Sequence, residues 1–319
     1  MRALIVGHCG QDGSYLWEQL QARGATLIGL SQRRLDTQGT AVLVDEHWQS
    51  AGGLRALLQA FQPQYIYYLA AYHHSAQQRS EDDSLLWERS HEVHVAQFHR
   101  LLDAVSATAI DTRIFYAASS RIFGVAETAP QNEDTPRQPE CVYGLTKSMG
   151  MMLADFYRRT QGMPISCGIL YNHESPRRGA AFVSQRVVEG LIAHKFDGAP
   201  QLRLGSLSAR VDWGYAPDYT LAMQRILETA GGQDFVIATG VTHAVGDWVR
   251  VAAEYLGLDW RRCVSEDQSL LRRPSQELCG DFTRLHQATG WRPEVSFESM
   301  VRFMLDAALA RRAGQLSVG

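Results

Sequence analysis

A tyrosine and a lysine four residues apart, preceded by two serines, are the side chains in this sequence best suited to chemistry. Tyr143 and Lys147 share the motif Tyr-x-x-x-Lys, and Ser119 and Ser120 follow a short apolar run. Residues at i and i+4 face the same side of a helix, so the Lys147 ammonium can lie beside the Tyr143 phenol and lower its pKa. The phenol can then exchange a proton with a substrate hydroxyl, which Ser119 can hold, while hydride moves. We therefore predict Ser119, Tyr143 and Lys147 as catalytic groups.

Three glycines at a spacing of three predict a nucleotide-binding turn near the start of the chain. The motif Gly-x-x-Gly-x-x-Gly over residues 7–13 follows the apolar run Ala3–Val6 and opens a helix-like stretch, Ser14 to Arg23. A tight turn needs glycine, and so does close approach of the backbone to a pyrophosphate. The helix N-terminus adds N–H groups and positive potential. The residues of this turn expected to bind a dinucleotide are Gly7, Gly10, Gln11, Asp12 and Gly13.

Two arginines after the second apolar run favour NADP(H) over NAD(H). The run ends in Leu30-Ser31-Gln32-Arg33-Arg34, without the acidic residue that usually binds the ribose 2′-hydroxyl of NAD. Guanidinium groups suit a 2′-phosphate, because they form charge-assisted hydrogen bonds with it. An ordinary solvated basic loop is the alternative interpretation. Asp45, after the third run, is a further candidate for the cofactor, as an acceptor for the adenine amino group.

The elements that must position these residues alternate between apolar runs and amphipathic stretches. This alternation predicts parallel strands connected by helices, which is a doubly wound Rossmann sheet of the α/β class. The expected strands are Ala3–Val6, Thr26–Leu30, Ala41–Val44, Tyr65–Leu69, Ile114–Tyr116 and Ile165–Leu170, with Phe235–Thr239 as a late return to the sheet.

The rhythm changes after Asn172. Residues 172–210 are richer in arginine, glycine and loops, and the stretch from Trp248 to Ala313 reads as mostly helical. We expect an NADP-binding Rossmann domain over residues 1–171, with a late return of about 211–240. Residues 172–210 and 241–319 are then expected to form a smaller C-terminal substrate-binding domain that closes over the first.

Composition excludes several classes of protein. With 319 residues, 45% of them hydrophobic, the chain can bury a sizeable core, and a net charge of −3 gives no basic footprint for nucleic acid. The five cysteines are scattered without metal-ligand spacing, so we expect no disulfide framework, no metal and a reducing compartment. No apolar stretch approaches the roughly 18 residues of a membrane span, and no signal peptide is visible. A soluble, cytoplasmic protein is expected.

Two adjacent histidines and one cysteine near the predicted site each have more than one interpretation. His73 and His74 follow the fourth apolar run, and adjacent residues do not share a face, so metal ligation is not expected. Packing or a hydrogen bond to substrate remain for them, with His74 as the substrate-binding candidate. Cys141 lies two residues before Tyr143, where it either reaches the active site or is a buried, inert thiol.

Five longer strings are far more specific than these short motifs. They are residues 10–16 (GQDGSYL), 68–71 (YLAA), 168–179 (GILYNHESPRRG), 212–219 (DWGYAPDY) and 234–241 (DFVIATGV). Through them, the chain resembles the extended short-chain dehydrogenase/reductase family, and within it the GDP-mannose 4,6-dehydratases. The resemblance runs through most of the chain.

The resemblance implies a nucleotide diphosphate sugar as substrate, GDP-linked, and a homodimer or homotetramer. In the family pattern, Asn172 contacts the diphosphate, and the loop from Arg33 to Thr40 reaches a neighbouring subunit near its cofactor. The further residues that it places at the cofactor are Leu69, Ala70 and Ala71, and those that it places at the substrate are Ser120, Glu174, Arg178 and Arg273.

Departures from the family pattern decide which reaction to expect. Ser119-Ser120-Arg121-Ile122-Phe123-Gly124 stands where the family reads Thr-Ser-Glu-Leu-Tyr-Gly. Arg121 therefore occupies the position of the glutamate that acts as acid and base in eliminating water, and a guanidinium stays protonated at any relevant pH. His94 stands where an asparagine or aspartate is usual, and Val211 replaces an arginine.

Three functions follow from this pattern. The first is an NADP-dependent keto-sugar reductase or dehydrogenase that uses Ser119, Tyr143 and Lys147, with Arg121 binding a substrate oxygen. The second is a dehydratase or epimerase that recruits another acid or base, such as Cys141, His73, His74 or Glu127. The third is a catalytically silent sugar-nucleotide binding protein, which the intact Tyr-x-x-x-Lys motif argues against. The first is the hypothesis that we favour.

Overall fold

A large parallel sheet forms the centre of the protein. The computed structural model covers residues 1–319 and describes residues 1–31, 42–43, 50–72, 83–126, 128–229, 231–270 and 277–314. Seven strands lie in the order β10-β6-β5-β4-β1-β2-β3, and neighbouring strands are parallel. They are β1 (Arg2–Val6), β2 (Thr26–Leu30), β3 (Val42–Leu43), β4 (Tyr65–Tyr68), β5 (Arg113–Ala117), β6 (Ile165–Leu170) and β10 (Asp234–Ile237). The predicted Rossmann sheet is confirmed, and β10 is its late return.

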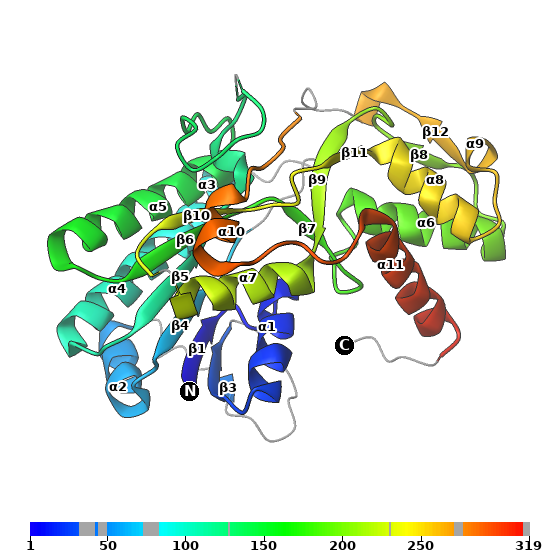
Figure 1. The fold of residues 1–319 in the computed structure, drawn as a ribbon. Helices are drawn as coiled ribbons and strands as arrows, with labels where there is room; N and C mark the ends of the chain where they lie inside the picture. Colours follow the sequence, from blue (N-terminus) through cyan, green and yellow to red (C-terminus); the bar gives the residue numbers. More distant parts are fainter. Residues whose placement is uncertain are drawn as a thin grey trace.

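Helices cover both faces of this sheet (Figure 1). Successive side chains of a strand point to opposite faces, so Leu4 and Val6 pack into one core and Ala3 and Ile5 into the other. Helices α2 (Ala51–Phe61), α4 (Gln97–Thr108) and α5 (Val142–Gln161) cover the first face. Helices α1 (Gln11–Ala22), α7 (Ala216–Thr229) and α10 (Thr283–Thr289) cover the second. Because both faces are covered, every residue of β6 is buried.

Local signals set the ends of α5, the helix that carries the Tyr-x-x-x-Lys motif. Cys141 has an extended backbone, and its Sγ accepts the Gly144 N–H at 3.4 Å, so the thiol caps the helix. Gly162 ends the helix in the left-handed conformation, with φ at 66°. The Lys147 amine donates to the carbonyl of Ala117, the last residue of β5, so the first turns of α5 lie beside the carboxyl end of that strand.

A third hydrophobic core lies to one side of the large sheet (Figure 1). It is enclosed by helices α6 (Val183–Asp197), α8 (Val245–Tyr255) and α11 (Phe297–Arg312), with short α9 (Trp260–Cys263) beside α8. Two small sheets border it: β7 (Asn172–Glu174), β9 (Arg210–Tyr215) and β11 (Thr242–Ala244) form one, and β8 (Leu202–Leu204) and β12 (Val264–Glu266) form the other. The domain boundaries given above stay a prediction, and β9 pairs outside the large sheet whereas α10 packs on α7 and β10.

The strand order reverses between β1 and β4, and this switch point places the candidate site. Ligands of open α/β sheets bind where the carboxyl ends of such strands diverge. The Leu69 N–H donates to the Val6 carbonyl at 2.9 Å, so the loop after β4 lies against the glycine turn after β1. None of the helices in the described residues is long and apolar enough to cross a membrane.

Candidate active site

The glycine turn after β1 is shaped for close approach of a ligand. Gly7 has φ at +92°, and a Cβ added there would lie 2.8 Å from the Ala70 nitrogen. A Cβ on Gly13 would lie 2.3 Å from the Gly7 carbonyl oxygen. Gly10 is the N-cap residue of α1, and no side chain occupies the N–H groups at this end of the helix through Gly10. A side chain at Gly7 or Gly13 would collide with the backbone, so the turn keeps a bare backbone cradle at a helix N-terminus. Such a cradle fits the pyrophosphate of a dinucleotide.

Asp12, in the first turn of α1, is paired with a histidine that the sequence analysis did not assign. His173 Nε2 lies 3.0 Å from both carboxylate oxygens of Asp12, and its Nδ1 donates to the Tyr171 carbonyl at 2.7 Å. Both ring nitrogens therefore face acceptors, which requires an imidazolium. Gln11 adds a hydrogen bond to Asp12 at 3.2 Å.

The two partners shift each other's pKa. Burial raises the pKa of Asp12, but the charge and hydrogen bond of His173 outweigh it, so the pKa lies below its ordinary value. Burial lowers the pKa of His173, but Asp12 reverses this, so the pKa is raised. The positive His173 offsets the acid at the N-terminus of α1, which would otherwise repel a phosphate. The string GILYNHESPRRG contains His173, but nothing in it names Asp12 as the partner.

The structure brings Ser119, Tyr143 and Lys147 together at the carboxyl end of β5. The Ser119 side chain lies close enough to the Tyr143 phenol to lower its pKa against the larger effect of burial, which raises it. Lys147 is buried, its Nζ donates to the Ala117 carbonyl at 2.7 Å and it lies 5.8 Å from the centre of the Tyr143 ring. A hydroxyl, a phenol and an amine thus converge on one point at the sheet edge. This arrangement can hold an oxygen atom of a ligand and exchange a proton with it.

The expected effect of Lys147 on the Tyr143 pKa was wrong for this state of the protein. Burial raises the Tyr143 pKa to about 12, and it is the charge of Arg178, then the Ser119 side chain, that oppose the rise. Burial lowers the pKa of Lys147 to about 7, against which Asp12 acts. The amine therefore loses much of its charge near neutral pH. The reason is desolvation, which spacing along a helix does not reveal.

Arg178 is held at this site by a buried acid. Its Nε lies 3.1 Å from Glu174 Oε2, which also accepts the Ser184 hydroxyl at 2.5 Å. The guanidinium also lies over the Phe182 ring at 3.5 Å. Glu174 is buried, and its carboxylate orients the Arg178 guanidinium. Asn172, at the start of β7, is exposed. The substrate-binding roles of these residues stay predictions.

Arg121 lies beside the start of α5, but its side chain is exposed. Its N–H donates to Ser119 Oγ at 3.3 Å, and a Cβ added to Gly144 would lie 2.3 Å from its carbonyl oxygen. The backbone is therefore fixed between Ser119 and α5. Ser120, next to it, is buried. The predicted residues that lie outside the described part of the chain are Arg33, Arg34, Asp45, His73, His74, Glu127 and Arg273.

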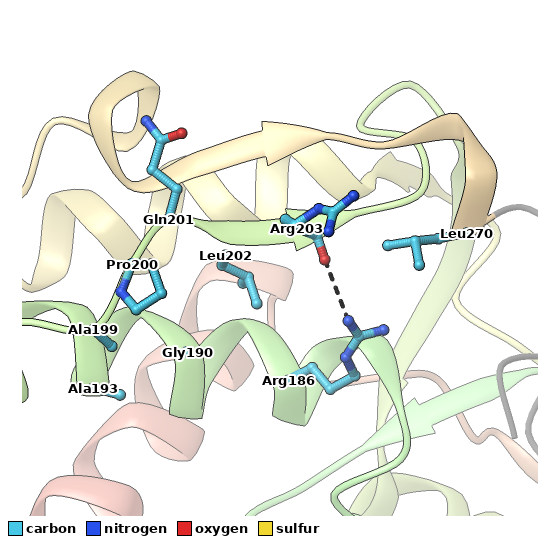
Figure 2. Close-up of a pocket in the computed structure, with 9 residues that line it drawn as sticks. All are labelled: Arg186, Gly190, Ala193, Ala199, Pro200, Gln201, Leu202, Arg203 and Leu270. Atoms are coloured by element: carbon cyan, nitrogen blue, oxygen red, sulfur yellow. Dashed lines mark hydrogen bonds between the residues drawn. The ribbon is translucent and has the colours of Figure 1, made fainter.

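A hollow of about 410 Å³ lies between α6 and β8 (Figure 2). The Arg186 guanidinium lies at one end of it and donates to the Arg203 carbonyl at 3.2 Å. Its wall is mainly apolar, formed by Gly190, Ala193, Ala199, Pro200, Leu202 and Leu270. No motif in the sequence indicates this hollow, because its lining comes from three separate stretches of the chain.

The parallel sheet, the glycine turn and the Ser119–Tyr143–Lys147 group define a protein of the short-chain dehydrogenase/reductase class. The model of the GDP-mannose 4,6 dehydratase family matches residues 4–304. The chain is 35% identical over 328 residues to GDP-mannose 4,6 dehydratase 2 of Arabidopsis thaliana, which covers 96% of this chain and 86% of that protein. The chain therefore belongs to the GDP-mannose 4,6-dehydratase family, and the resemblance inferred from the sequence is confirmed.

Solved structures show the same fold. The structure of RMD from Pseudomonas aeruginosa complexed with NADPH matches with a TM-score of 0.79 at 20% identity, over 96% of this chain and 98% of that one. The dTDP-glucose 4,6-dehydratase from Bacillus anthracis in complex with NAD matches with a TM-score of 0.83 at 16% identity, over 98% of each chain. At these identities the likeness establishes the fold alone.

Proposed function

We propose that this protein is an NADP-dependent oxidoreductase of a nucleotide-sugar, acting as a GDP-linked keto-sugar reductase or dehydrogenase. The bare cradle at Gly7 and Gly13 supports a bound dinucleotide, and Arg33 and Arg34 in the sequence favour its 2′-phosphate form. When bound, the nicotinamide ring supplies or accepts the hydride. A family of nucleotide-sugar dehydratases and solved relatives that hold NADPH or NAD support the cofactor and substrate class.

The residues of the chain supply the proton. In the reducing direction, the Tyr143 phenol gives its proton to the carbonyl oxygen of the sugar, while the Ser119 hydroxyl holds that oxygen. The raised Tyr143 pKa keeps the proton in place until the oxygen gains charge. The charge of Arg178, which already opposes the rise of the Tyr143 pKa, then stabilises the phenolate left behind.

The observation that carries the choice of reaction is Arg121. Elimination of water across C5 and C6 needs a group that takes the C5 proton and protonates the leaving hydroxyl, and a guanidinium can do neither. Hydride transfer at a ring carbon needs only Ser119, Tyr143 and Lys147. Arg121 is exposed beside them, where it can bind a substrate oxygen instead.

The positions of two arginines support a substrate whose sugar is linked to a nucleotide diphosphate. Arg178 lies near Tyr143, which suits a diphosphate next to the sugar. Arg186 follows in the first two turns of α6 and borders the mainly apolar hollow, which suits the flat faces of a nucleobase (Figure 2). We place the base of the GDP-sugar there.

An exposed apolar stripe supports a homo-oligomer. Leu145, Met152 and Phe156 lie on the outward face of α5 and are 41%, 66% and 49% exposed. Their i, i+7, i+11 spacing puts them in one row, and a second copy of the same helix could cover it. We propose a homodimer or homotetramer. Light scattering at micromolar concentration tests this, and a species of only 35.6 kDa would contradict it.

The decisive experiment uses Arg121. Purified protein is incubated with GDP-mannose and NADP⁺, and mass spectrometry follows the loss of one water. In parallel, a GDP-4-keto-sugar is offered with NADPH. We expect reduction of the keto-sugar and no useful dehydration, because loss of a general acid/base costs about 10² to 10⁴ in rate.

The Arg121→Glu variant should gain dehydration, whereas Arg121→Gln, which loses the charge without gaining a base, should not. Rapid dehydration by the wild-type protein would refute the proposal and point to a substitute acid or base.

A further inference from the structure

One histidine in the described helices lies in an irregular turn next to the site. The helical run of α3 (Asp83–His91) and α4 is interrupted by a π-helix, Glu92–Ala96, and His94 at its centre is fully buried. Two tyrosines of the large sheet fix this wide turn: the Tyr68 hydroxyl donates to the Val93 carbonyl at 2.5 Å, and the Tyr116 hydroxyl donates to the His94 carbonyl at 3.0 Å. Turns of this kind are rare and concentrate at functional sites.

The hydrogen bonds of the His94 ring have a fixed direction. The Tyr72 N–H donates to Nε2 at 3.0 Å, so Nε2 is an acceptor and the proton of the neutral ring is on Nδ1. Nδ1 lies 2.8 Å from Thr146 Oγ1, and that hydroxyl lies 2.9 Å from the Val142 carbonyl, to which it donates. The bonds therefore run in one direction, from Tyr72 through His94 and Thr146 to Val142.

This chain of hydrogen bonds connects the loop after β4, which borders the glycine turn, with the first turns of α5, which carry Tyr143 and Lys147. Tyr72 follows the loop of Ala70, which touches the glycine turn, and Thr146 belongs to the first turns of α5, between Tyr143 and Lys147. The His94 ring also stands edge-on to the Tyr143 ring, with centres 5.2 Å apart and planes at 88°. The His94 side chain thus contacts the loop after β4 through Tyr72, helix α5 through Thr146, and the ring of Tyr143.

We propose that His94 is a positioning residue that fixes the Tyr143 ring against the loop after β4 and serves only as the neutral Nδ1–H tautomer. The proposal rests on the proposed function of Tyr143. An aspartate here, which the family resemblance makes usual, has no proton for Thr146 when ionised, and an asparagine is too short to support the Tyr143 ring as well. The histidine does both.

Variants separate positioning from mere packing. His94→Phe keeps an aromatic ring against Tyr143 but removes both hydrogen bonds of the His94 ring and leaves the partly buried Tyr72 N–H without this acceptor. We expect kcat with the GDP-keto-sugar and NADPH to fall about 10-fold or more, with the KM of the sugar nucleotide nearly unchanged, because the nucleotide handle is bound elsewhere. His94→Asn, which restores one donor and one acceptor, should recover part of kcat.

The control is His286→Phe on α10, which removes an exposed histidine whose Nδ1 lies 3.0 Å from the Trp291 carbonyl. We expect it to leave kcat unchanged. Wild-type kcat in His94→Phe, or a raised KM at constant kcat, would overturn the proposal.

A direct test needs no substrate. In protein with ¹⁵N-labelled histidine, long-range ¹H–¹⁵N spectra report the protonation of each ring, and the signals absent from His94→Asn identify His94. We expect a neutral ring protonated on Nδ1 at pH 7. A proton on Nε2, or on both nitrogens, would overturn the assignment. If no nucleotide-sugar is turned over by the wild-type protein, the proposed function fails, and the tautomer still decides the structural part of this inference.

Discussion

Replacing Lys147 with methionine removes a buried amine whose charge depends on pH. Lys147 is 1% exposed, and burial lowers its pKa from 10.5 to about 7. In the unfolded chain the amine returns to its ordinary pKa, so between pH 7 and 10.5 the unfolded state binds more protons than the folded state. The free energy of unfolding therefore rises with pH across this window. Below pH 7 both states are protonated, and the full cost of burying the charge is present.

The size of the effect follows from the shift. One pKa unit corresponds to about 1.4 kcal/mol, so raising the pH from 7.5 to 9.5 should stabilise the folded protein by about 2.5 kcal/mol through this amine alone. The Lys147→Met variant lacks this contribution. The difference in unfolding free energy between wild type and variant should grow by that amount in favour of wild type.

Urea unfolding of cofactor-free protein, followed by tryptophan fluorescence at pH 7.5, 8.5 and 9.5, measures this difference. Groups that titrate in both proteins cancel, including Tyr143, and the lost hydrogen bond to the Ala117 carbonyl adds a constant offset. A difference that stays constant to within about 0.5 kcal/mol would refute the reasoning, since it would mean that Lys147 keeps an ordinary pKa when folded.

Two further predictions concern turnover and cofactor. Tyr143→Phe keeps the ring and removes the proton, so turnover should fall by about 10² or more while NADPH affinity stays near wild type. Unchanged turnover on the true substrate would show that another group moves the proton. Arg33→Ala combined with Arg34→Ala should weaken NADPH binding by roughly 1.5–3 kcal/mol and leave NADH binding unaffected. Titration by cofactor fluorescence measures both, and equal affinities of wild type for the two cofactors would contradict the preference for NADP(H).

The sheet and the convergence of Ser119, Tyr143 and Lys147 could be predicted because both depend on local patterns. The apolar runs of β1 and β6 are buried on both faces and alternate with helices, which leaves few topologies. The Tyr-x-x-x-Lys spacing puts both side chains on one face of a helix. A serine at the end of a parallel strand must lie at the edge of the sheet where the carboxyl ends of the strands meet. These local patterns can be interpreted without knowledge of the rest of the fold.

The electrostatics of the site could not be predicted in the same way. Asp12 and His173 are 161 residues apart in the chain, and only the fold brings their side chains into contact. The pKa of Lys147 depends on desolvation, which the fold sets, and the sequence argument gave its ammonium a role that belongs in this state to Arg178. His94 was recognised as a departure from the family pattern, but its partners Tyr72 and Thr146 lie on different elements.

Position 121 can change without disturbing the predicted catalytic residues, because only its backbone is packed. The Arg121 N–H donates to Ser119 and its carbonyl lies against Gly144, and every residue except proline keeps both contacts. The guanidinium projects to the exposed side, so a glutamate there needs no repacking of the core. Arg121→Glu is therefore expected to unfold at the same urea concentration as wild type. Under that condition, a change of reaction in this variant reports on the chemistry of one side chain and not on the stability of the site.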